Sequence, residues 1–298
     1  MGPSVVTLGT FDGVHRGHQA LLAEAKRQAL PLKSPVLAVT FTKPPRDYFK
    51  KPLVPSLLTT PQEKEILLTR FGADRVDTLR FGPALASLPP DRFVRDYLVK
   101  RWRASTVVVG FNFRFGKGQE GDTPFLERQG CEAGVRVCVV PAVHAGGVVS
   151  SGRIRSFLAE GDLEKAQELL GHSYGAMGPV VRGRQMGRRL GYPTANIFVP
   201  DEKILPTGVF FVRVLLSSGW ERFGLCNVGK NPTVSSLTPQ RSLEVHVLDF
   251  VGDLVGQTIS LEFLKKIRDE KKFKSLDLLK RQLREDERVG RGFVEPRF

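Results

Sequence analysis

The hydrophobic pattern changes once along the chain, near residue 172, and this change limits the folds that the chain can adopt. Before it, helical stretches alternate with short β-branched runs at 4–8, 36–41, 75–79, 106–109 and 135–140. The helical stretches are 19–30, 61–70, 90–102, 123–129 and 156–170. Alternation of this kind predicts β-α-β units around a parallel sheet.

After residue 172 the chain shows successive strand-like runs divided by Gly, Pro and Asn turns. These runs are 178–181, 194–199, 208–216, 220–228, 242–250 and 258–264. They favour a small antiparallel barrel, and a charged amphipathic helix at 275–287 closes the chain. We therefore expect two domains, 1–172 and 173–298, which agrees with the usual length of about 100–200 residues for one domain.

Composition narrows the class of protein. The net charge of +14 points to polyanionic partners, either nucleic acid or nucleotide phosphates, although Lys and Arg are spread along the chain as on an ordinary solvated surface. The three cysteines form no C-x-x-C pair, which fits reduced thiols. No apolar run approaches the roughly 20 residues of a membrane span. We expect a cytoplasmic protein without a membrane partner.

The densest motif, LGTFDGVHRGH at 8–18, falls at a predicted strand-to-helix turn. Its specified positions are Gly9, Phe11, Asp12, Gly13, His15, Gly17 and His18. Glycines let the backbone approach a phosphate closely, and the helix N-terminus supplies N–H donors and a positive dipole end. His15 and His18 add donors, and positive charge if protonated. The motif predicts a phosphate site. A zinc half-site is the alternative, but no cluster of Cys or His supplies further ligands.

Three further polar segments suggest ligand contacts. The segment 110–122 follows a strand and mixes phenylalanines with Arg114 and Lys117, a composition able to hold a flat ring and a phosphate. The segment 150–155, Ser-Ser-Gly-Arg-Ile-Arg, starts a helix, and its guanidiniums could grip anionic oxygens in bidentate fashion. The third, 183–196, is a Gly- and Arg-rich loop outside the Walker pattern. Phosphate-type loops in two unlike halves imply two reactions.

Several separated motifs, in the right order, resemble one family. GTFDGVHRGHQALL at 9–22 resembles the nucleotidyltransferase signature of bacterial bifunctional riboflavin kinase/FMN adenylyltransferases, also called FAD synthetases. GRRLGYPTANI at 187–197, NVGKNPT at 227–233 and EVHVLDFVGDLVG at 244–256 resemble its flavokinase signatures. The resemblance implies an N-terminal Rossmann-like nucleotidyltransferase domain with a parallel sheet, and a C-terminal small antiparallel β-barrel with a terminal helix. It also implies phosphorylation of riboflavin to FMN and adenylylation of FMN to FAD.

For the kinase half, the resemblance implies Glu244 as the general base for the ribityl 5′-hydroxyl of riboflavin. Without the family motif, Glu244 reads as a charge on the exposed face of a strand. Thr194 and Asn196 would hold the Mg²⁺ carried by ATP. The ATP loop would comprise Gly183, Arg184, Gly187, Arg189, Gly191, Pro193, Thr194 and Asn196. The flavin would contact Asn227, Gly229 and Glu244.

For the adenylyltransferase half, the resemblance implies that His15 and His18 bind the ATP phosphates and stabilise the departing pyrophosphate. Asp12 would orient the turn or contact the nucleotide. The remaining ATP-binding positions would be Gly9, Phe11, Gly13, Gly17, Ser150, Ser151, Arg153 and Arg155. The flavin would contact Asn112, Phe113, Arg114 and Phe115. The FMN phosphate would attack the α-phosphorus of ATP in line, without a protein nucleophile.

Four positions depart from the family pattern, all in the first half. Asn112 stands where Asp is usual, Pro44 where His is usual, Gly152 where Thr is usual and Gln119 where Arg is common. Two alternatives remain: a flavokinase with weakened or lost adenylyl transfer, which these departures would allow, and a basic nucleic-acid-binding protein built on the nucleotidyltransferase scaffold, which the net charge would allow. For the enzyme, the expected partners are ATP, riboflavin, FMN, FAD and pyrophosphate, and the expected state is a monomer or weak homo-oligomer.

Overall fold

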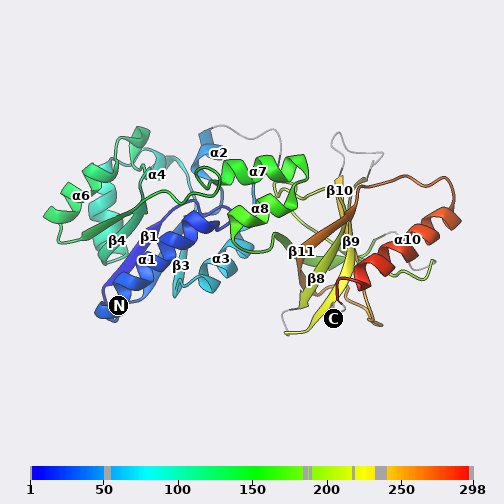
Figure 1. Ribbon diagram of the computed structural model, residues 1–298. Coiled ribbons are helices and arrows are strands. Elements are labelled where there is room, and N and C mark those ends of the chain that lie inside the picture. Colours follow the sequence, from blue (N-terminus) through cyan, green and yellow to red (C-terminus); the bar gives the residue numbers. More distant parts are fainter. Residues whose placement is uncertain are drawn as a thin grey trace. The chain divides into compact units, whose positions relative to one another are not determined.

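The computed structural model describes residues 2–49, 55–183, 187, 190–216, 219–231 and 240–294. The chain divides into two compact units (Figure 1). The first unit comprises Met1–Arg153 with Leu169–Gly171, and the second comprises Ile154–Glu168 with His172–Phe298. The predicted fold class is confirmed: the first unit holds a parallel sheet with helices, and the second holds a closed antiparallel barrel followed by a helix.

The first unit is built on five described strands in the order β3-β2-β1-β4-β5. Their bounds are β1 Ser4–Leu8, β2 Val36–Phe41, β3 Arg75–Leu79, β4 Ala104–Gly110 and β5 Arg136–Val140. All neighbours pair in parallel, so every strand ends at the same edge of the sheet. The strand order reverses between β1 and β4, which makes the ends of these two strands the expected ligand position.

Helices cover the sheet, and most of them agree with the sequence expectation. They are α1 Arg16–Leu32, α2 Pro45–Phe49, α3 Pro61–Arg70, α4 Pro83–Ala86, α5 Pro90–Arg92 and α6 Thr123–Glu132. A π-helix, η1 Phe93–Arg101, continues α5, and η2 Lys117–Gln119 is a short 3₁₀ turn. One core includes Val5, Phe11 and Leu22, and a second includes Val107, Phe93 and Leu126.

The amphipathic stretch predicted as one helix over 156–170 is two helices. They are α7 Ser151–Glu160 and α8 Leu163–Leu170. Gly161 separates them with φ +79°, a left-handed conformation that glycine adopts readily, and Asp162 then accepts a hydrogen bond from the N–H of Lys165. The apolar spacing continues through this break, so periodicity alone does not reveal it.

The barrel of the second unit runs β10-β7-β6-β11-β8-β9, with antiparallel pairing throughout. Its strands are β6 Gly175–Val181, β7 Ala195–Ile197, β8 Gly208–Leu216, β9 Glu221–Asn231, β10 Gln240–Val247 and β11 Thr258–Arg268. Side chains of β10 alternate as predicted, with Leu243, Val245 and Val247 buried between more exposed neighbours. Alternate residues of β10 are therefore available on the outer face of the barrel.

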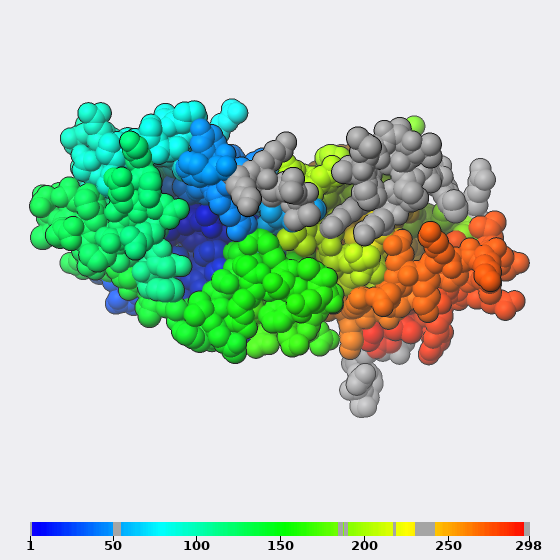
Figure 2. All heavy atoms as spheres, turned by 90° about the horizontal axis from the view of Figure 1, so that it is seen from above, coloured from blue at the N-terminus to red at the C-terminus, as the bar shows by residue number. Residues whose placement is uncertain are grey.

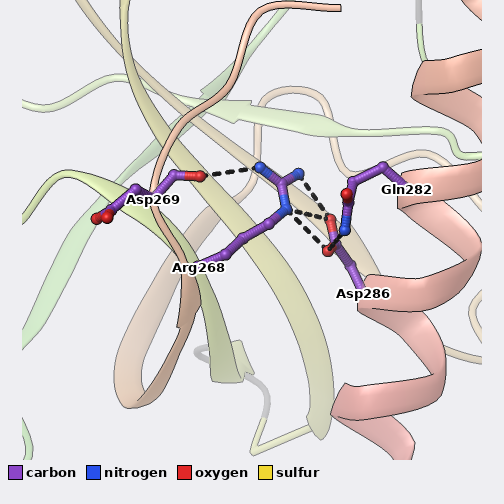
Figure 3. Close-up of polar contacts among 4 residues, drawn as sticks. All are labelled: Arg268, Asp269, Gln282 and Asp286. Carbon is purple, nitrogen blue, oxygen red and sulfur yellow. Dashed lines mark hydrogen bonds and ion pairs between the residues drawn. The ribbon is translucent and has the colours of Figure 1, made fainter.

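The C-terminal helix α10, Leu276–Arg291, lies beside β9 and β11 (Figure 1). Ser275 caps it, with its hydroxyl accepting from the N–H of Leu278. Arg268, at the end of β11, donates three hydrogen bonds from Nε and Nη2 to the carboxylate of Asp286 at 2.7–3.1 Å (Figure 3). Gln282 donates to the same carboxylate at 2.9 Å, and Arg268 Nη1 reaches the carbonyl oxygen of Asp269 at 3.0 Å. Asp286 is only 1% exposed, so this network anchors α10 to the barrel.

Asp286→Ala should lower the free energy of unfolding of the second unit by about 3–5 kcal/mol, because it leaves the Arg268 charge largely buried without its partner. Asp249→Ala is the matched control. That carboxylate also pairs with an arginine of α10, Arg291, but both groups are exposed, and its loss should cost about 0–1 kcal/mol. Urea unfolding of the two variants measures the difference. Equal losses would show that the buried pair does not anchor the helix.

Candidate active sites

The Gly9–His18 turn lies where the strand order of the first unit reverses. It connects β1 to α1, and the segment after β4 flanks it at the same edge of the sheet. Figure 2 shows the dark-blue N-terminal surface recessed beside the light-blue segment around α2. Gln19 fixes the start of α1 by donating to the carbonyl oxygens of Val14 and Leu170, at 2.9 and 2.7 Å. The structure therefore brings the predicted phosphate motif to the expected ligand position of a parallel sheet.

The turn has an unusual backbone. Phe11, Gly13 and Val14 have φ values of +48°, +84° and +37°, although left-handed conformations are rare for side chains such as valine. Both Phe11 and Val14 are fully buried, so packing holds the strained turn in place. A Cβ atom at Gly13 would also lie 2.8 Å from Leu58, which excludes a larger residue there. The glycine is required by both its conformation and its surroundings.

Asp12 orients the turn. Its Oδ1 accepts hydrogen bonds from the backbone N–H groups of Leu58 and Thr59, at 2.9 and 3.1 Å, and from the Thr59 hydroxyl at 3.3 Å. That hydroxyl in turn accepts from the N–H of Gly13 at 3.0 Å. Of the two roles predicted for Asp12, these contacts support the orienting one.

His15 and His18 stack face to face, with ring centroids 3.6 Å apart. His15 is buried and precedes the first residue of α1, whereas His18 is half-buried and lies in the first turn. Desolvation lowers the pKa of His18, with smaller contributions from His15 and Lys64. Within the described chain, its Nδ1 is buried without a hydrogen-bond partner. At neutral pH His18 is therefore an uncharged donor or acceptor, rather than the cation that the sequence allowed.

Lys64 is a buried cation near this pair, and the sequence analysis did not identify it. It is 3% exposed and lies in the first half of α3. Its Nζ donates to the carbonyl oxygen of Phe41 at 2.8 Å and to the Thr40 hydroxyl at 3.4 Å. Burial lowers the pKa of Lys64 to about 8, against an opposing effect of Asp12. A lysine in an amphipathic helix ordinarily reads as a solvated charge, so the sequence offers no signal for this placement.

The predicted flavin residues after β4 fall into two groups. Phe115 belongs to the core: it is buried, contacts Phe93 and pairs with Gly121 through two backbone hydrogen bonds of 3.0 Å. Phe113 is half-buried and stacks on Phe115 at 5.5 Å. Asn112 and Arg114 are exposed, and Arg114 forms a 3.4 Å ion pair with Asp122. Asn112 and Arg114 thus remain the polar candidates at this edge.

The Ser-Ser-Gly-Arg segment reaches the turn through one hydroxyl. Ser151 begins α7 and donates to the backbone oxygen of Asp12 at 2.9 Å. Ser150 accepts from the N–H of Arg153 at 3.4 Å. The Arg153 guanidinium donates to the carbonyl oxygens of Ala145, Gly146 and Val148, at 3.0–3.2 Å, and so orders the preceding loop. Arg155 is half-buried on α7 and is grouped with the second unit.

An exposed aromatic cluster at the same sheet edge was not predicted. It comprises Phe41, Tyr48, Phe49 and Phe81, from the ends of β2 and α2 and the segment after β3. The ring centroids lie 5.2–5.8 Å apart in edge-to-face contacts. Tyr48 and Phe49 are 46% and 70% exposed, a large apolar surface for adjacent residues. In the sequence, the adjacent aromatic residues Tyr48 and Phe49 are the feature that could have indicated this cluster.

Three polar residues form a row on the outer face of the barrel. Glu244 of β10 lies directly opposite Asn196 of β7 and Asn227 of β9 in the strand register. Directly opposite residues have Cβ atoms about 4.5–5.5 Å apart, so the three side chains share one small area. Thr194 adds a hydroxyl, which donates to Glu244 Oε2 at 3.4 Å. The structure thus brings together the predicted base and both predicted metal ligands.

Described glycines of the Gly- and Arg-rich loop lie close to this row. A Cβ atom at Gly183 would collide with the Asn196 amide, and one at Gly187 would collide with the carbonyl oxygen of Tyr192. Gly191 has φ +85°. Pro193 accepts a hydrogen bond at 2.8 Å through its carbonyl oxygen if His246 Nδ1 carries the proton. The predicted Arg184 and Arg189 lie outside the described residues.

The backbone beside Asn227 is also closely packed. A Cβ atom at Gly229 would collide with the Glu270 carboxylate, which places a second acidic group beside Asn227. Cys226, next to Asn227, points to the barrel interior, and burial raises the pKa of its thiol. Cys131 and Cys138 are also free thiols, as the sequence predicted. Among the described residues, no group of three or more His, Cys, Asp or Glu side chains could hold a metal ion.

Two family models divide the chain in the same order as the two units. The model described as FAD synthetase matches residues 1–153, and the model described as riboflavin kinase matches residues 170–294. Both describe flavin enzymes, and neither describes a nucleic-acid-binding protein. Within the described chain, no helix has the length and apolar character needed to cross a membrane.

Relatives match over nearly the full length. A bifunctional riboflavin kinase/FMN adenylyltransferase from Escherichia coli is 40% identical over 97% of this chain and 92% of its own length. One from Pseudomonas fluorescens is 36% identical over 98% and 93%. A solved structure, described as a macrolide-efflux protein from Streptococcus pneumoniae, shares the fold with a TM-score of 0.85 and 34% identity, over 98% of this chain and 95% of that one. The chain belongs to the family of bifunctional riboflavin kinase/FMN adenylyltransferases.

Proposed function

We propose that the chain carries out both reactions of its family at two separate sites. Residues 173–298 phosphorylate riboflavin to FMN, and residues 1–172 adenylylate FMN to FAD with release of pyrophosphate. The observation that carries the proposal is the presence of two distinct polar sites in two unlike folds. One is the Glu244 row on the barrel, and the other is the Gly9–His18 turn at the switch point of the sheet.

In the kinase reaction, Glu244 accepts the proton of the ribityl 5′-hydroxyl as that oxygen attacks the γ-phosphorus of ATP. A carboxylate within reach of the hydroxyl can act as this base, and phosphoryl transfer otherwise depends on positioning and charge neutralisation. Asn227 and Gly229 line the riboflavin side of the row, while the loop at Gly183, Gly187 and Gly191 covers the ATP phosphates.

Thr194 and Asn196 hold the Mg²⁺ that accompanies ATP. Hydroxyl, amide and carboxylate oxygens are hard ligands, and Mg²⁺ usually takes only one or two protein ligands together with substrate phosphates and waters. The row, with Thr194 beside Glu244 and Asn196 opposite it, supports this assignment. When bound, the ion neutralises charge on the β- and γ-phosphates.

Thr194→Val should raise the free Mg²⁺ concentration that half-saturates FMN formation by roughly tenfold, because a metal ligand is lost while the shape is retained. The measurement is the initial rate of riboflavin phosphorylation against free Mg²⁺. FAD formation from supplied FMN in the same protein is the internal control and should keep its Mg²⁺ dependence. An unchanged Mg²⁺ requirement for the kinase would remove Thr194 from the metal site.

In the adenylyl transfer, the FMN phosphate attacks the α-phosphorus of ATP, and pyrophosphate leaves. His15 and His18 donate hydrogen bonds to the phosphate oxygens as charge moves onto the leaving group, and the first N–H groups of α1 add further donors. Gly9 and Gly17 let the chain approach the phosphates. Ser150, Ser151, Arg153 and Arg155 belong to the same ATP site, with Ser151 and Arg153 also ordering its backbone.

The flavin of FMN lies at the sheet edge that carries both exposed aromatic rings and polar side chains. The cluster of Phe41, Tyr48, Phe49 and Phe81 offers apolar surface for the ring system. Asn112 and Arg114 offer hydrogen bonds and charge for the phosphate-bearing end. Phe113 supports them through its contact with Phe115. The cytoplasmic location and the monomeric or weakly associating state expected from the sequence also belong to this proposal.

The four positions that depart from the family pattern affect the rate of adenylyl transfer. Gly152 is exposed in the first turn of α7, and Asn112 is exposed after β4, so each removes a group that could contact a ligand. Pro44 accepts a backbone hydrogen bond that starts α2, and Gln119 has a left-handed φ of +60°. Loss of one uncharged hydrogen bond costs about 0.5–1.5 kcal/mol, which slows a site that retains its histidines without abolishing its activity.

A further inference from the structure

The adenylyl-transfer site handles anions, yet His18 supplies little positive charge at neutral pH. Burial lowers the pKa of His18, and the stacked His15 opposes a second charge on the pair. The Arg153 guanidinium donates hydrogen bonds to three carbonyl oxygens of the preceding loop. Among the groups described above near the turn, the buried cation is Lys64.

Lys64 is connected to the turn by hydrogen bonds. Its Nζ donates to Thr40 Oγ1 at 3.4 Å, and that hydroxyl donates to the backbone oxygen of Thr10 at 3.0 Å. Lys64 Nζ also donates a hydrogen bond to the carbonyl oxygen of Phe41, at the carboxyl end of β2. The capping box of Thr60 and Glu63 fixes the start of α3, and hence the position of Lys64 along it.

Within the described chain, Lys64 forms no ion pair with a carboxylate, and Asp12 offsets only part of the effect of burial. The ionisable groups that act on Lys64 or respond to it are Asp12, whose charge raises the pKa of Lys64, and His18, whose pKa the Lys64 charge lowers. Removing an ammonium from water is unfavourable unless partners replace the lost hydration. An anionic substrate at the neighbouring turn supplies such a partner.

We propose that Lys64 is a positioning residue of the adenylyl-transfer site, whose buried charge attracts the anionic phosphates of the substrates toward the Gly9–His18 turn. Lys64 holds the sheet edge in position through its hydrogen bonds to Thr40 and Phe41. Its charge attracts the phosphates through space. The inference rests on the proposed role of the turn. His18→Ala tests that role separately, because FAD formation unaffected by that change would refute the turn assignment whatever the Lys64 variants show.

Lys64→Met separates this role from a structural one, because methionine retains the apolar stem and removes the charge. We expect the thermal midpoint to stay the same or rise, since an ammonium buried without a carboxylate partner is unfavourable and methionine removes that cost. The KM for ATP, for FMN or for both in FAD formation should rise about tenfold or more, as for loss of a hydrogen bond or ion pair to a charged group. Riboflavin phosphorylation in the same chain should not change.

Separate KM measurements for ATP and for FMN identify the phosphate group that Lys64 attracts. A rise confined to ATP assigns the charge to its polyphosphate, and a rise confined to FMN assigns it to the 5′-phosphate. Lys26→Met, at an exposed position of α1, is the matched control and should change neither KM. The proposal is overturned if Lys64→Met leaves both KM values unchanged, and a lowered thermal midpoint in that case shows that Lys64 is a purely structural bridge.

A pH profile keeps the proposal testable if the methionine variant does not fold. The ammonium is charged below its pKa of about 8 and neutral above it, so kcat/KM for FAD formation in the natural protein should fall as the pH rises through that value. Lys64→Arg keeps the charge at all these values and should lose this decline. Riboflavin phosphorylation in the same proteins is the control for effects of pH on ATP and Mg²⁺. If kcat/KM for FAD formation declined equally in the natural protein and in Lys64→Arg, the proposal would be overturned.

Discussion

Replacing Glu244 with glutamine should abolish FMN formation while FAD formation from supplied FMN continues. Glutamine preserves the shape of the side chain and its contact with Thr194, but it cannot accept the proton of the attacking hydroxyl. Loss of a general base lowers a rate by about 10²–10⁴-fold. The measurement is the initial rate of each reaction, with riboflavin in one assay and FMN in the other.

Glu262→Gln is the matched control for this change. Glu262 is a half-buried glutamate on another strand of the same barrel, β11, where it pairs with Arg213 at 3.5 Å. Its replacement should leave both reactions near their original rates. If Glu244→Gln retained most of its FMN formation, the outer face of β10 would be an ordinary polar strand face, as its alternating pattern alone suggests.

His18→Ala should have the opposite effect, with loss of FAD formation and normal FMN formation. The imidazole would no longer donate to phosphate oxygens as charge develops on the leaving pyrophosphate. Removal of one such donor costs about 10²–10³-fold in kcat. The rate of FAD formation from FMN and ATP measures the loss, and riboflavin phosphorylation in the same sample shows that the chain remains folded.

The low pKa of His18 makes this variant informative about charge as well as hydrogen bonding. His18→Asn keeps a neutral donor and should retain more activity than the alanine variant if the histidine acts while uncharged. Equal losses in the asparagine and alanine variants would instead favour a protonated imidazole in the substrate complex. Impairment of both reactions in a folded His18 variant would contradict separate sites.

The sequence predicted the two architectures because each has its own periodicity. Strands such as β1 and β2 were found at their observed bounds, since β-branched runs in a buried parallel sheet are short and nearly continuous. It also predicted the row of Thr194, Asn196 and Glu244 as one site, although only through the family resemblance. The register that brings the three together depends on the barrel and cannot be read from spacing along the chain.

The contacts that the sequence did not indicate depend on tertiary structure. Phe115 lies in a segment rich in ligand-type residues, yet packing against Phe93 makes it a core residue. Arg153 sits in a phosphate-type motif, and its guanidinium also donates hydrogen bonds to the carbonyls of its own loop, which the sequence did not indicate. Lys64 lies in an amphipathic helix, and only the position of α3 against the end of β2 buries it. In each case the residue type permits both roles, and the surroundings decide.

The most direct test is a chromatographic time course of riboflavin, FMN and FAD after purified protein is mixed with riboflavin, excess ATP and Mg²⁺, run with oxidised and with reduced flavin. Two active sites in one chain predict that FMN rises first and then declines as FAD accumulates. FMN that accumulates without FAD would contradict an active first half and favour a flavokinase with lost adenylyl transfer. The absence of any flavin turnover, together with salt-sensitive binding to nucleic acid, would contradict the enzyme altogether.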